Sequence, residues 1–312
     1  MTTPRHIVPG ALVMVTTRCV QRLFKLTPSK EVNELFEYLL AYTSEKYNVG
    51  VIAAVAMSNH AHLVAVDHDG RLPDMLQEMN MILARGMNHF RGEHGTFFDR
   101  NNVDIKSLED DGALFVALGY LAANPVAAGC VERGADWVGV RSVPKDMGAP
   151  GREVKRPEWL FRNKAGLYLG ELPETAILRY ELPPGFGEEG RGQAVFAAEM
   201  AVHFAEKWAR EKNARRGVKY LGRALCWNAD HNRRGTQWEP HGPGTGPDPI
   251  MATSMETRYV AEIERQAYLD GYREALVLWQ QGDHAVIFPF GTWNVVRHHA
   301  AVVAVPPPNF RR

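Results

Sequence analysis

Two apolar runs separated by only two residues constrain the fold of this chain more than any other feature. Val49–Met57 and His60–Asp67 each have the length and apolar content of a strand, and Ser58-Asn59 between them is a turn signal. A connection this short joins antiparallel neighbours, so the sequence predicts a β-hairpin. Its second strand is unusual because it begins with two imidazoles, those of His60 and His62.

The segments around this hairpin alternate between strand and helix patterns. Strand patterns cover Ala11–Cys19 and Phe97–Ile105, and helical spacing of apolar residues covers 27–47, Leu72–Phe90 and Glu109–Ala127. The resulting order, β-α-β-β-α-β-α, is that of a split β-α-β, ferredoxin-like fold. We therefore expect an α+β domain whose antiparallel sheet has helices on one face and leaves the other face free for a ligand.

The character of the sequence changes after about Gly148. We expect residues 1–148 to form this domain, and residues 149–312 to form a mainly helical C-terminal extension with a possible DNA-binding or accessory role. Within the extension, helical patterns cover Gly192–Arg216 and Glu256–Gln281. The first of these predicts an amphipathic helix with large apolar residues on one side, namely Phe196, Met200, Phe204 and Trp208.

Charge is balanced overall but uneven along the chain. The 36 Lys and Arg residues equal the 36 Asp and Glu residues, yet Lys207–Arg234 holds nine basic residues and two acidic ones. That region predicts a surface that attracts a polyanion. The N-terminal residues lack the pattern of a signal peptide, and no apolar stretch reaches the roughly 18 residues that a membrane span needs. Three cysteines without paired spacing predict no disulfide framework, so we expect a cytoplasmic protein with no membrane association.

The two histidines are spaced to act together. Residues i and i+2 of a strand point to the same face, so His60 and His62 are expected side by side, about 7 Å apart along the strand, with Ala61 pointing to the core. Two neutral imidazoles can hold one divalent cation, which then needs a third ligand from elsewhere in the chain. A purely structural or solvated histidine pair is the alternative.

A second pair of polar side chains lies on the helical segment 109–127. Tyr120 and Asn124 are four residues apart and therefore neighbours on one helix face. The carbonyl oxygen of Asn124 is a suitable ligand for a hard cation, and a nearby cation can activate the phenol of Tyr120. The alternative for Tyr120 is an aromatic ring that packs its helix against the sheet.

These motifs together resemble a known enzyme family. Met57–Val64, which contains His60-Ala61-His62, resembles the HUH motif of single-tyrosine transposases, and Tyr120–Gly129 resembles their tyrosine helix. Gly95–Arg100, between the two, resembles an aromatic-basic segment found there in the same order. The closest branch is the group of REP-associated tyrosine transposases, and the resemblance covers roughly residues 10–145.

The resemblance implies a DNA nicking-joining enzyme that acts in transposition and is associated with the nucleoid. His60 and His62 would be metal ligands, with Asn124 as a candidate third, for Mg²⁺ or Mn²⁺. Tyr120 would attack a phosphate of single-stranded DNA and leave a 5′-phosphotyrosine link and a free 3′-hydroxyl. The substrates would be strands that fold into imperfect hairpins. Monomeric and dimeric states both remain open, and the alternative function is a retired, hairpin-binding or regulatory protein on the same fold.

Basic residues around such a site would neutralise DNA phosphates. The candidates are Arg85, Arg91 and Arg100 in the first half and Arg215, Arg216, Lys219 and Arg223 in the second. Unpaired bases can stack on tryptophan rings. The candidates for stacking are Trp227, Trp238 and Trp293, for each of which core packing is the alternative.

Overall fold

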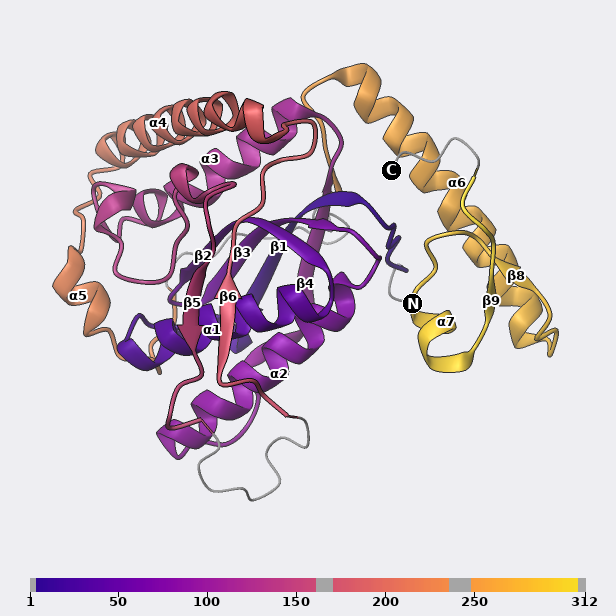
Figure 1. Cartoon of the computed structure of the whole chain (residues 1–312), viewed down its shortest axis with the longest axis horizontal. Coiled ribbons are helices and arrows are strands. Elements are labelled where there is room, and N and C mark those ends of the chain that lie inside the picture. The colour runs from indigo at the N-terminus through magenta and orange to yellow at the C-terminus, as the bar shows by residue number, and fades with distance from the viewer. Residues whose placement is uncertain (1–3, 161–170, 236–247, 308–312) are drawn as a thin grey trace.

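The computed structural model describes residues 4–160, 171–235 and 248–307, without the side chains of residues 100–102. The elements of the first half follow the predicted order (Figure 1). They are β1 (Ala11–Cys19), α1 (Lys30–Lys46), β2 (Val49–Met57), β3 (His60–Asp67), α2 (Leu72–Arg91), β4 (Phe98–Leu108) and α3 (Asp111–Ala127). The predicted β-hairpin is confirmed, because β2 and β3 pair as antiparallel neighbours.

Local signals explain why these elements begin and end where they do. The side chain of Ser29 accepts a hydrogen bond from the backbone N–H of Val32 and caps α1, and the side chain of Asp110 does the same for Ala113 at the start of α3. Helix α2 ends at Gly92, whose φ of 65° lies in the left-handed region that favours glycine. Pro125 lies in the last turn of α3, which ends soon after it.

The sheet is mixed rather than wholly antiparallel, so the prediction of an antiparallel sheet is only partly right. Within the described residues its strand order is β2-β3-β1-β4-β7. The first four strands pair antiparallel, whereas β7 (Ile250–Met251) joins the edge of β4 in the parallel direction. The protein therefore has a mixed α+β architecture, and the late strand β7 links the second half of the chain to the sheet of the first.

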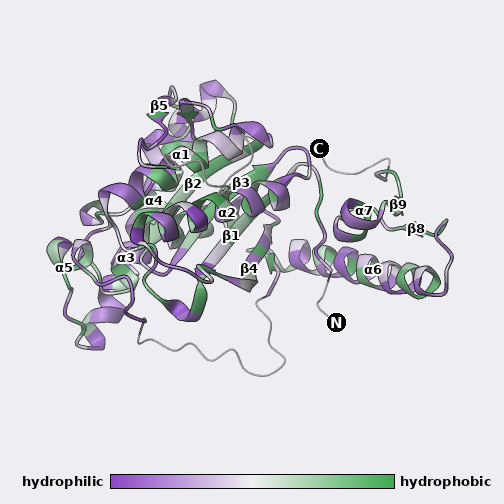
Figure 2. Ribbon diagram, turned by 90° about the horizontal axis from the view of Figure 1, so that it is seen from below, coloured by the Kyte–Doolittle hydropathy of each residue, from purple (hydrophilic) through white to green (hydrophobic). Residues whose placement is uncertain are grey.

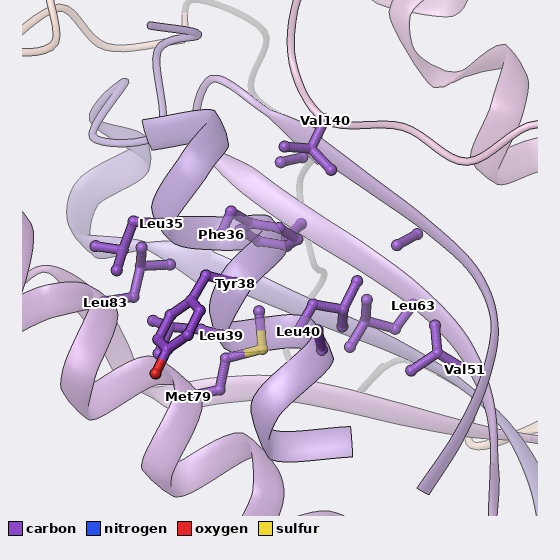
Figure 3. Close-up of a cluster of buried hydrophobic side chains, with 14 of the residues drawn as sticks. Leu35, Phe36, Tyr38, Leu39, Leu40, Val51, Leu63, Met79, Leu83 and Val140 are labelled. Atoms are coloured by element: carbon purple, nitrogen blue, oxygen red, sulfur yellow. The ribbon is translucent and has the colours of Figure 1, made fainter. Parts of the chain in front are cut away.

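Helices α1 and α2 cover one face of the sheet. Val51 and Leu63 from the strands pack there against Leu39 and Met79 from the helices, in a cluster of almost completely buried side chains (Figure 3). The fully buried ring of Tyr38 belongs to the same cluster, and its hydroxyl donates to the carbonyl oxygen of Pro173, 2.6 Å away. Burial of this apolar surface is the main stabilising contribution on this side of the sheet.

The opposite face of the sheet is also covered, so the expectation of a free face is wrong. Leu114, Leu118 and Leu121 of α3 pack there against residues such as Ile52 and Val64. Helix α4 (Arg191–Arg215) then packs on α3, which makes it the outermost layer of this side (Figure 1). The physical reason is the strongly apolar composition of α3, which needs burial on more than one side. Any site on this face must therefore lie where α3 meets the sheet.

The remaining elements complete the second half. They are β5 (Arg152–Lys155), β6 (Thr175–Leu178), α5 (Arg223–Trp227), α6 (Met255–Gln280), β8 (Ile287–Phe288), α7 (Asn294–His299) and β9 (Val302–Val303). Helix α6 with α7, β8 and β9 forms an arm that stands beside the main body and has its own small apolar cluster around Phe288 (Figure 2). The backbone N–H of Ile7 donates to the carbonyl oxygen of Gly291 and ties this arm to the N-terminal segment. In the described part of the chain, every helix is too short or too polar to span a bilayer.

Candidate active site

The histidine pair lies on the side of β3 that faces α3. Ala61, between the two imidazoles, belongs to the cluster on the opposite face, as the strand alternation predicts. The two rings meet edge to face, with their centroids 4.7 Å apart. The ring of His62 is buried, whereas His60, at the first position of the strand, is only partly covered. The pair therefore lies at the end of the strand, where burial decreases from His62 to His60.

Helix α3 brings both of its predicted site residues to this histidine pair. Asn124 is buried and contacts both imidazoles. The ring of Tyr120 lies edge to face with the ring of His62 at a centroid separation of 5.4 Å, and 51% of the residue is exposed. Tyr120 therefore does not pack its helix into the core. Its exposure leaves the phenol accessible to a large substrate while its ring stays in contact with the buried imidazole.

Hydrogen bonds fix the orientation of each imidazole. The Thr16 hydroxyl bonds Nδ1 of His62 at 2.9 Å, and the Asn124 amide nitrogen donates to Nε2 of the same ring at 3.1 Å. For His60, Nδ1 donates to the Asn59 side-chain oxygen at 2.6 Å, and Nε2 lies 3.2 Å from Oδ1 of Asn124. The Nε2 atoms of both rings thus lie next to one amide group. Their Nδ1 atoms, on the other side of each ring, are hydrogen-bonded to Thr16 and Asn59.

Both imidazoles are neutral at physiological pH. Burial lowers the pKa of His60 to about 4, with a further contribution from the nearby charges of Arg18 and Arg22. The side-chain oxygen of Asn124 acts in the opposite direction, because it would accept a hydrogen bond from the protonated ring. Burial likewise lowers the pKa of His62 well below its usual value, assisted by His60 and Arg18. A neutral imidazole has a free lone pair and is the form that ligates metals.

The arrangement of these atoms fits a divalent cation. A neutral His60 has one ring proton, and since Nδ1 uses it, the lone pair of Nε2 faces the lone pairs of Asn124 Oδ1. A cation between these two atoms would replace a repulsive contact with two bonds. Adjacent ligands in an octahedral Mg²⁺ shell lie about 3.0 Å apart for metal–oxygen bonds of about 2.1 Å. The distance of 3.2 Å between Nε2 of His60 and Oδ1 of Asn124 is close to this separation.

This fit depends on an amide ligand. Among the described residues, no group of three or more His, Cys, Asp or Glu side chains is placed to hold a metal ion. The two imidazoles alone would bind a cation weakly, because affinity rises with the number of ligands. The identity of the cation and the roles of His60, His62 and Asn124 remain predictions.

The sequence analysis missed three residues of β1 and the turn that follows it. Thr16 pairs with His62 and Arg18 with His60 in the antiparallel register of β1 and β3, so both side chains lie on the same face as the imidazoles. Arg22 follows in the turn Val20–Arg22, where it and Gln21 adopt left-handed φ values of 57° and 50°. Non-glycine residues in this region are uncommon and concentrate at functional sites. Thr16 and Arg18 would have been identified only from strand register, which the sequence did not provide, and no sequence pattern singled out Arg22.

The predicted DNA-binding residues fall into two groups. Arg85 is exposed on α2, which covers the face of the sheet opposite the imidazoles. Arg91 ends the same helix, where its guanidinium donates to the carbonyl oxygen of Lys25 at 2.9 Å. The side chain of Arg100 lies outside the described part of the structure, as does the whole of Trp238. The structure therefore does not bring Arg85 to the imidazoles.

The second group lies close to the end of the helix that carries Tyr120. The backbone N–H groups of Leu221 and Gly222 donate to the carbonyl oxygens of Gly129 and Cys130, just after α3. The basic residues around this junction are all exposed, namely Arg215, Arg216, Lys219 and Arg223. Trp227 is 42% exposed nearby, whereas Trp293 lies half-buried in the α6 arm, where its ring contacts that of His298. A basic surface thus follows directly on the tyrosine helix.

Comparison with known proteins finds a weak structural likeness. No protein-family model matches this sequence, and no curated protein matches it significantly. Among solved structures, the chain is similar to that of a REP-associated tyrosine transposase bound to a REP hairpin. The TM-score is 0.40 and the identity 14%, over 55% of this chain and 93% of that chain. A likeness of this strength carries no argument about function, which has to come from the site itself.

Proposed function

We propose that the protein is a metal-dependent single-strand DNA endonuclease and strand transferase, a transposase-like enzyme that acts on hairpin-forming DNA. Tyr120 is the nucleophile, and His60, His62 and Asn124 hold Mg²⁺ or Mn²⁺. The observation that carries this proposal is the meeting of two neutral imidazoles, one amide and one exposed phenol at the same end of the sheet. The ferredoxin-like assignment belongs to the same proposal and is supported by the antiparallel order β2-β3-β1-β4.

In the reaction, the phenolic oxygen of Tyr120 attacks a backbone phosphorus atom. The new bond joins this oxygen to the phosphorus, which stays attached to the 5′ oxygen of the downstream nucleotide, and the bond from phosphorus to the 3′ oxygen of the upstream nucleotide breaks. The phenol gives up its proton, and the leaving 3′ oxygen gains one to become a hydroxyl. A bound divalent cation would polarise the phosphate and favour the phenolate. Because one ester replaces another, a later attack by a 3′-hydroxyl can reverse the exchange and join a strand.

Residues beside the imidazoles support this chemistry. Arg18 and Arg22 lie near enough to the histidines to depress the His60 pKa, so their charge also acts on a phosphate at the site. Phosphate groups carry negative charge that increases at the attacked phosphorus, and fixed cations stabilise it. Thr16 holds the His62 ring from its Nδ1 side and acts as a positioning residue.

Covalent trapping tests the proposal. The purified protein is mixed with Mn²⁺ and an end-labelled single-stranded hairpin oligonucleotide, then run under denaturing conditions. A protein–DNA adduct that survives denaturation and disappears after protease treatment is expected. Tyr120→Phe should abolish the adduct, whereas the matched control Tyr259→Phe, an exposed tyrosine on α6, should form it normally.

The paired substitution His60→Ala with His62→Ala should also abolish the adduct, and a chelator should do so in the wild-type protein. An adduct that persists in Tyr120→Phe would assign the nucleophile to another residue and overturn the proposal. An adduct formed equally well in excess chelator would overturn the metal-dependent mechanism.

A hairpin-binding protein without cleavage activity is the second candidate. The observation that favours it is the exposed basic surface after α3, formed by Arg215, Arg216, Lys219 and Arg223, which can bind DNA without any chemistry at Tyr120. Tight binding of hairpin DNA with no adduct across a broad set of oligonucleotides would establish this function instead.

A further inference from the structure

Helix α4 exposes a large apolar side chain at every fourth position. Phe196, Met200, Phe204 and Trp208 are exposed to 64%, 36%, 59% and 62%. We call these four residues the α4 ridge. The residues of α4 that are buried are small or polar, namely Ala194, Ala198, Ala209 and Asn213. The amphipathic pattern predicted from the sequence is therefore present, but its large residues point away from the protein.

Close packing of α3 and α4 explains this orientation. A Cβ atom added at Gly119 would lie 2.7 Å from the carbonyl oxygen of Ala201 and 3.2 Å from the Cβ of Ala205. Helices that approach this closely accept only small residues between them. The side of α4 that faces α3 therefore carries small residues such as alanine, and the large apolar residues of the α4 ridge lie on the exposed side.

The α4 ridge lies on the same side of the α3–α4 pair as Tyr120. The two helices run parallel, because Gly119 contacts Ala201 and Ala205, and further along the pair Asn213 donates to the Val126 carbonyl oxygen at 2.7 Å. Successive residues turn by about 100° around a helix. Tyr120 follows Gly119, and Phe204 precedes Ala205.

The step from Gly119 to Tyr120 turns the side chain by about 100° away from the side of α3 that faces α4. The step from Ala205 back to Phe204 turns it by the same angle, in the opposite sense, away from the side of α4 that faces α3. Because the two helices are parallel and face each other, both turns lead to the same side of the pair. Gly134 identifies the opposite side of the pair. It lies next to the carbonyl oxygen of Ala122 from α3 and the carboxylate of Glu206 from α4, and neither residue is on the side of Tyr120 and Phe204. Tyr120 and Phe204 therefore stand at the same level and on the same flank of the pair. From there the ridge continues along α4, which is the outer helix on this side of the sheet (Figure 1).

Positive charge accompanies the C-terminal half of the ridge. The ammonium group of Lys212 lies 4.9 Å from the ring centroid of Trp208. Between Lys207 and Lys219 the chain carries six basic residues and a single acidic one, Glu211. Aromatic rings flanked by cations are the features that bind single strands, because bases stack on the rings and phosphates pair with the cations.

A second copy of the chain fits this surface less well. With roughly 150–250 Å² of surface per large aromatic side chain, the exposed fractions correspond to roughly 450 Å² per copy, or about 900 Å² for a symmetric pair. Stable interfaces bury about 1,200 Å² or more.

We propose that the α4 ridge is a stacking surface for the unpaired bases of single-stranded DNA. The strand passes Tyr120 at the level of Phe204 and continues over Trp208 toward the basic residues Arg215, Arg216 and Lys219, and Met200 and Phe196 extend the surface in the other direction. The identity of the strand as DNA rests on the proposed function. The ridge adds a second contact region that holds the strand beyond the reacting phosphate. It selects unstacked bases, since the bases of an intact duplex cannot reach the rings.

Fluorescence anisotropy with the full chain tests the ridge. Binding of a labelled oligothymidine and of a blunt duplex of equal length is measured in the Tyr120→Phe background, where no covalent adduct can form. We expect Phe204→Ala with Trp208→Ala to weaken binding of the single strand at least tenfold and to leave duplex binding unchanged. Trp208→Phe, which keeps an aromatic ring, should restore most of the loss of Trp208→Ala. The matched control is Tyr259→Ala, which removes an equally exposed aromatic ring from α6.

Salt dependence separates stacking from charge. The ridge variants should keep the wild-type slope of log affinity against log salt concentration, whereas Lys212→Ala should reduce it. Equal binding of the single strand by wild type and ridge variants would overturn the proposal. So would a wild-type dimer that the ridge substitutions convert to a monomer, since the ridge would then bind a second copy.

The two proposals fail separately. Ridge-dependent binding without any adduct in the wild-type protein would refute only the proposed catalysis. An adduct together with ridge-independent binding would refute only the stacking surface.

Discussion

Replacement of Gly119 by alanine tests how closely α4 packs on the tyrosine helix. Two effects of opposite sign act at this position. Alanine is favoured over glycine inside a helix by about 1 kcal/mol. The added Cβ would however lie 2.7 Å from a backbone carbonyl oxygen of α4, so the two helices must separate. Overpacking of this kind costs about 1–3 kcal/mol. We therefore expect a net loss of about 1 kcal/mol in the free energy of unfolding.

Gly271→Ala is the matched control. Gly271 lies inside α6, where an added Cβ meets Pro289 at 3.8 Å, an ordinary van der Waals contact. Only the helix preference acts there, so this substitution should stabilise its helix by about 1 kcal/mol. The two variants should thus differ by about 2 kcal/mol, a factor of roughly 30 in the unfolding equilibrium. Urea denaturation followed by circular dichroism measures both midpoints.

The same substitution should affect chemistry at Tyr120. A shift of α3 moves Tyr120 and Asn124 together relative to the imidazoles, which are fixed in the sheet. Misplacement of reacting groups by about 1 Å can lower a rate about 100-fold. In the trapping assay, Gly119→Ala should form the adduct at least tenfold more slowly than Gly271→Ala. If Gly119→Ala proved as stable and as active as its control, the close contact between α3 and α4 would be refuted.

Two further substitutions probe the surroundings of the site. Thr16→Val keeps the shape of the side chain but removes the hydroxyl that bonds His62 Nδ1. The Mn²⁺ concentration for half-maximal adduct formation should therefore rise about 10–100-fold. An unchanged Mn²⁺ concentration would show that Thr16 does not position His62. Burial alone would raise the pKa of Asp110, but hydrogen bonds from the backbone of Ala113, from Ser254 and from Thr253 outweigh it and lower that pKa. Its contribution to stability is therefore present above the ordinary carboxyl pKa of about 3.9 and is lost as the pH falls through the lower folded value. Asp110→Asn should flatten the acid side of the stability–pH curve in urea titrations, and an unchanged acid limb would contradict this assignment.

Much of the first half could be predicted because its apolar runs are bounded by strong local signals. The predicted limits of Ala11–Cys19 and His60–Asp67 agree with β1 and β3. The predicted helical segments 27–47 and Glu109–Ala127 begin close to the observed starts of α1 and α3, where the side chains of Ser29 and Asp110 cap the helices that follow. The alternation of β3 also placed Ala61 in the core and both imidazoles on the other face.

Other features depend on tertiary contacts that no local pattern contains. The strongly apolar helix α3 could cover either face of the sheet, and the sequence did not reveal that it closes the face expected to be free. The inward side of α4 is made of alanine, so the larger apolar residues of the ridge dominate its pattern and suggest the wrong side. Arg18 could be placed beside His60 only after the register between β1 and β3 was known. Hydrophobic periodicity identifies an element but does not say which partner it meets.

The second half of the chain determines the position of the tyrosine helix. Asn124 ties α3 to the imidazoles on its sheet side, and Gly119 admits α4 on its outer side. The buried amide of Asn213 then holds the last turn of α3 through the Val126 carbonyl oxygen. Tyr120 lies between these attachments, so its distance from His62 depends on α4 as well as on the sheet. A fragment that ended at residue 148 would lose both outer attachments while it kept every residue of the candidate site. We infer that such a fragment would hold Tyr120 less firmly than the full chain does, because an unpacked helix face no longer restrains its position.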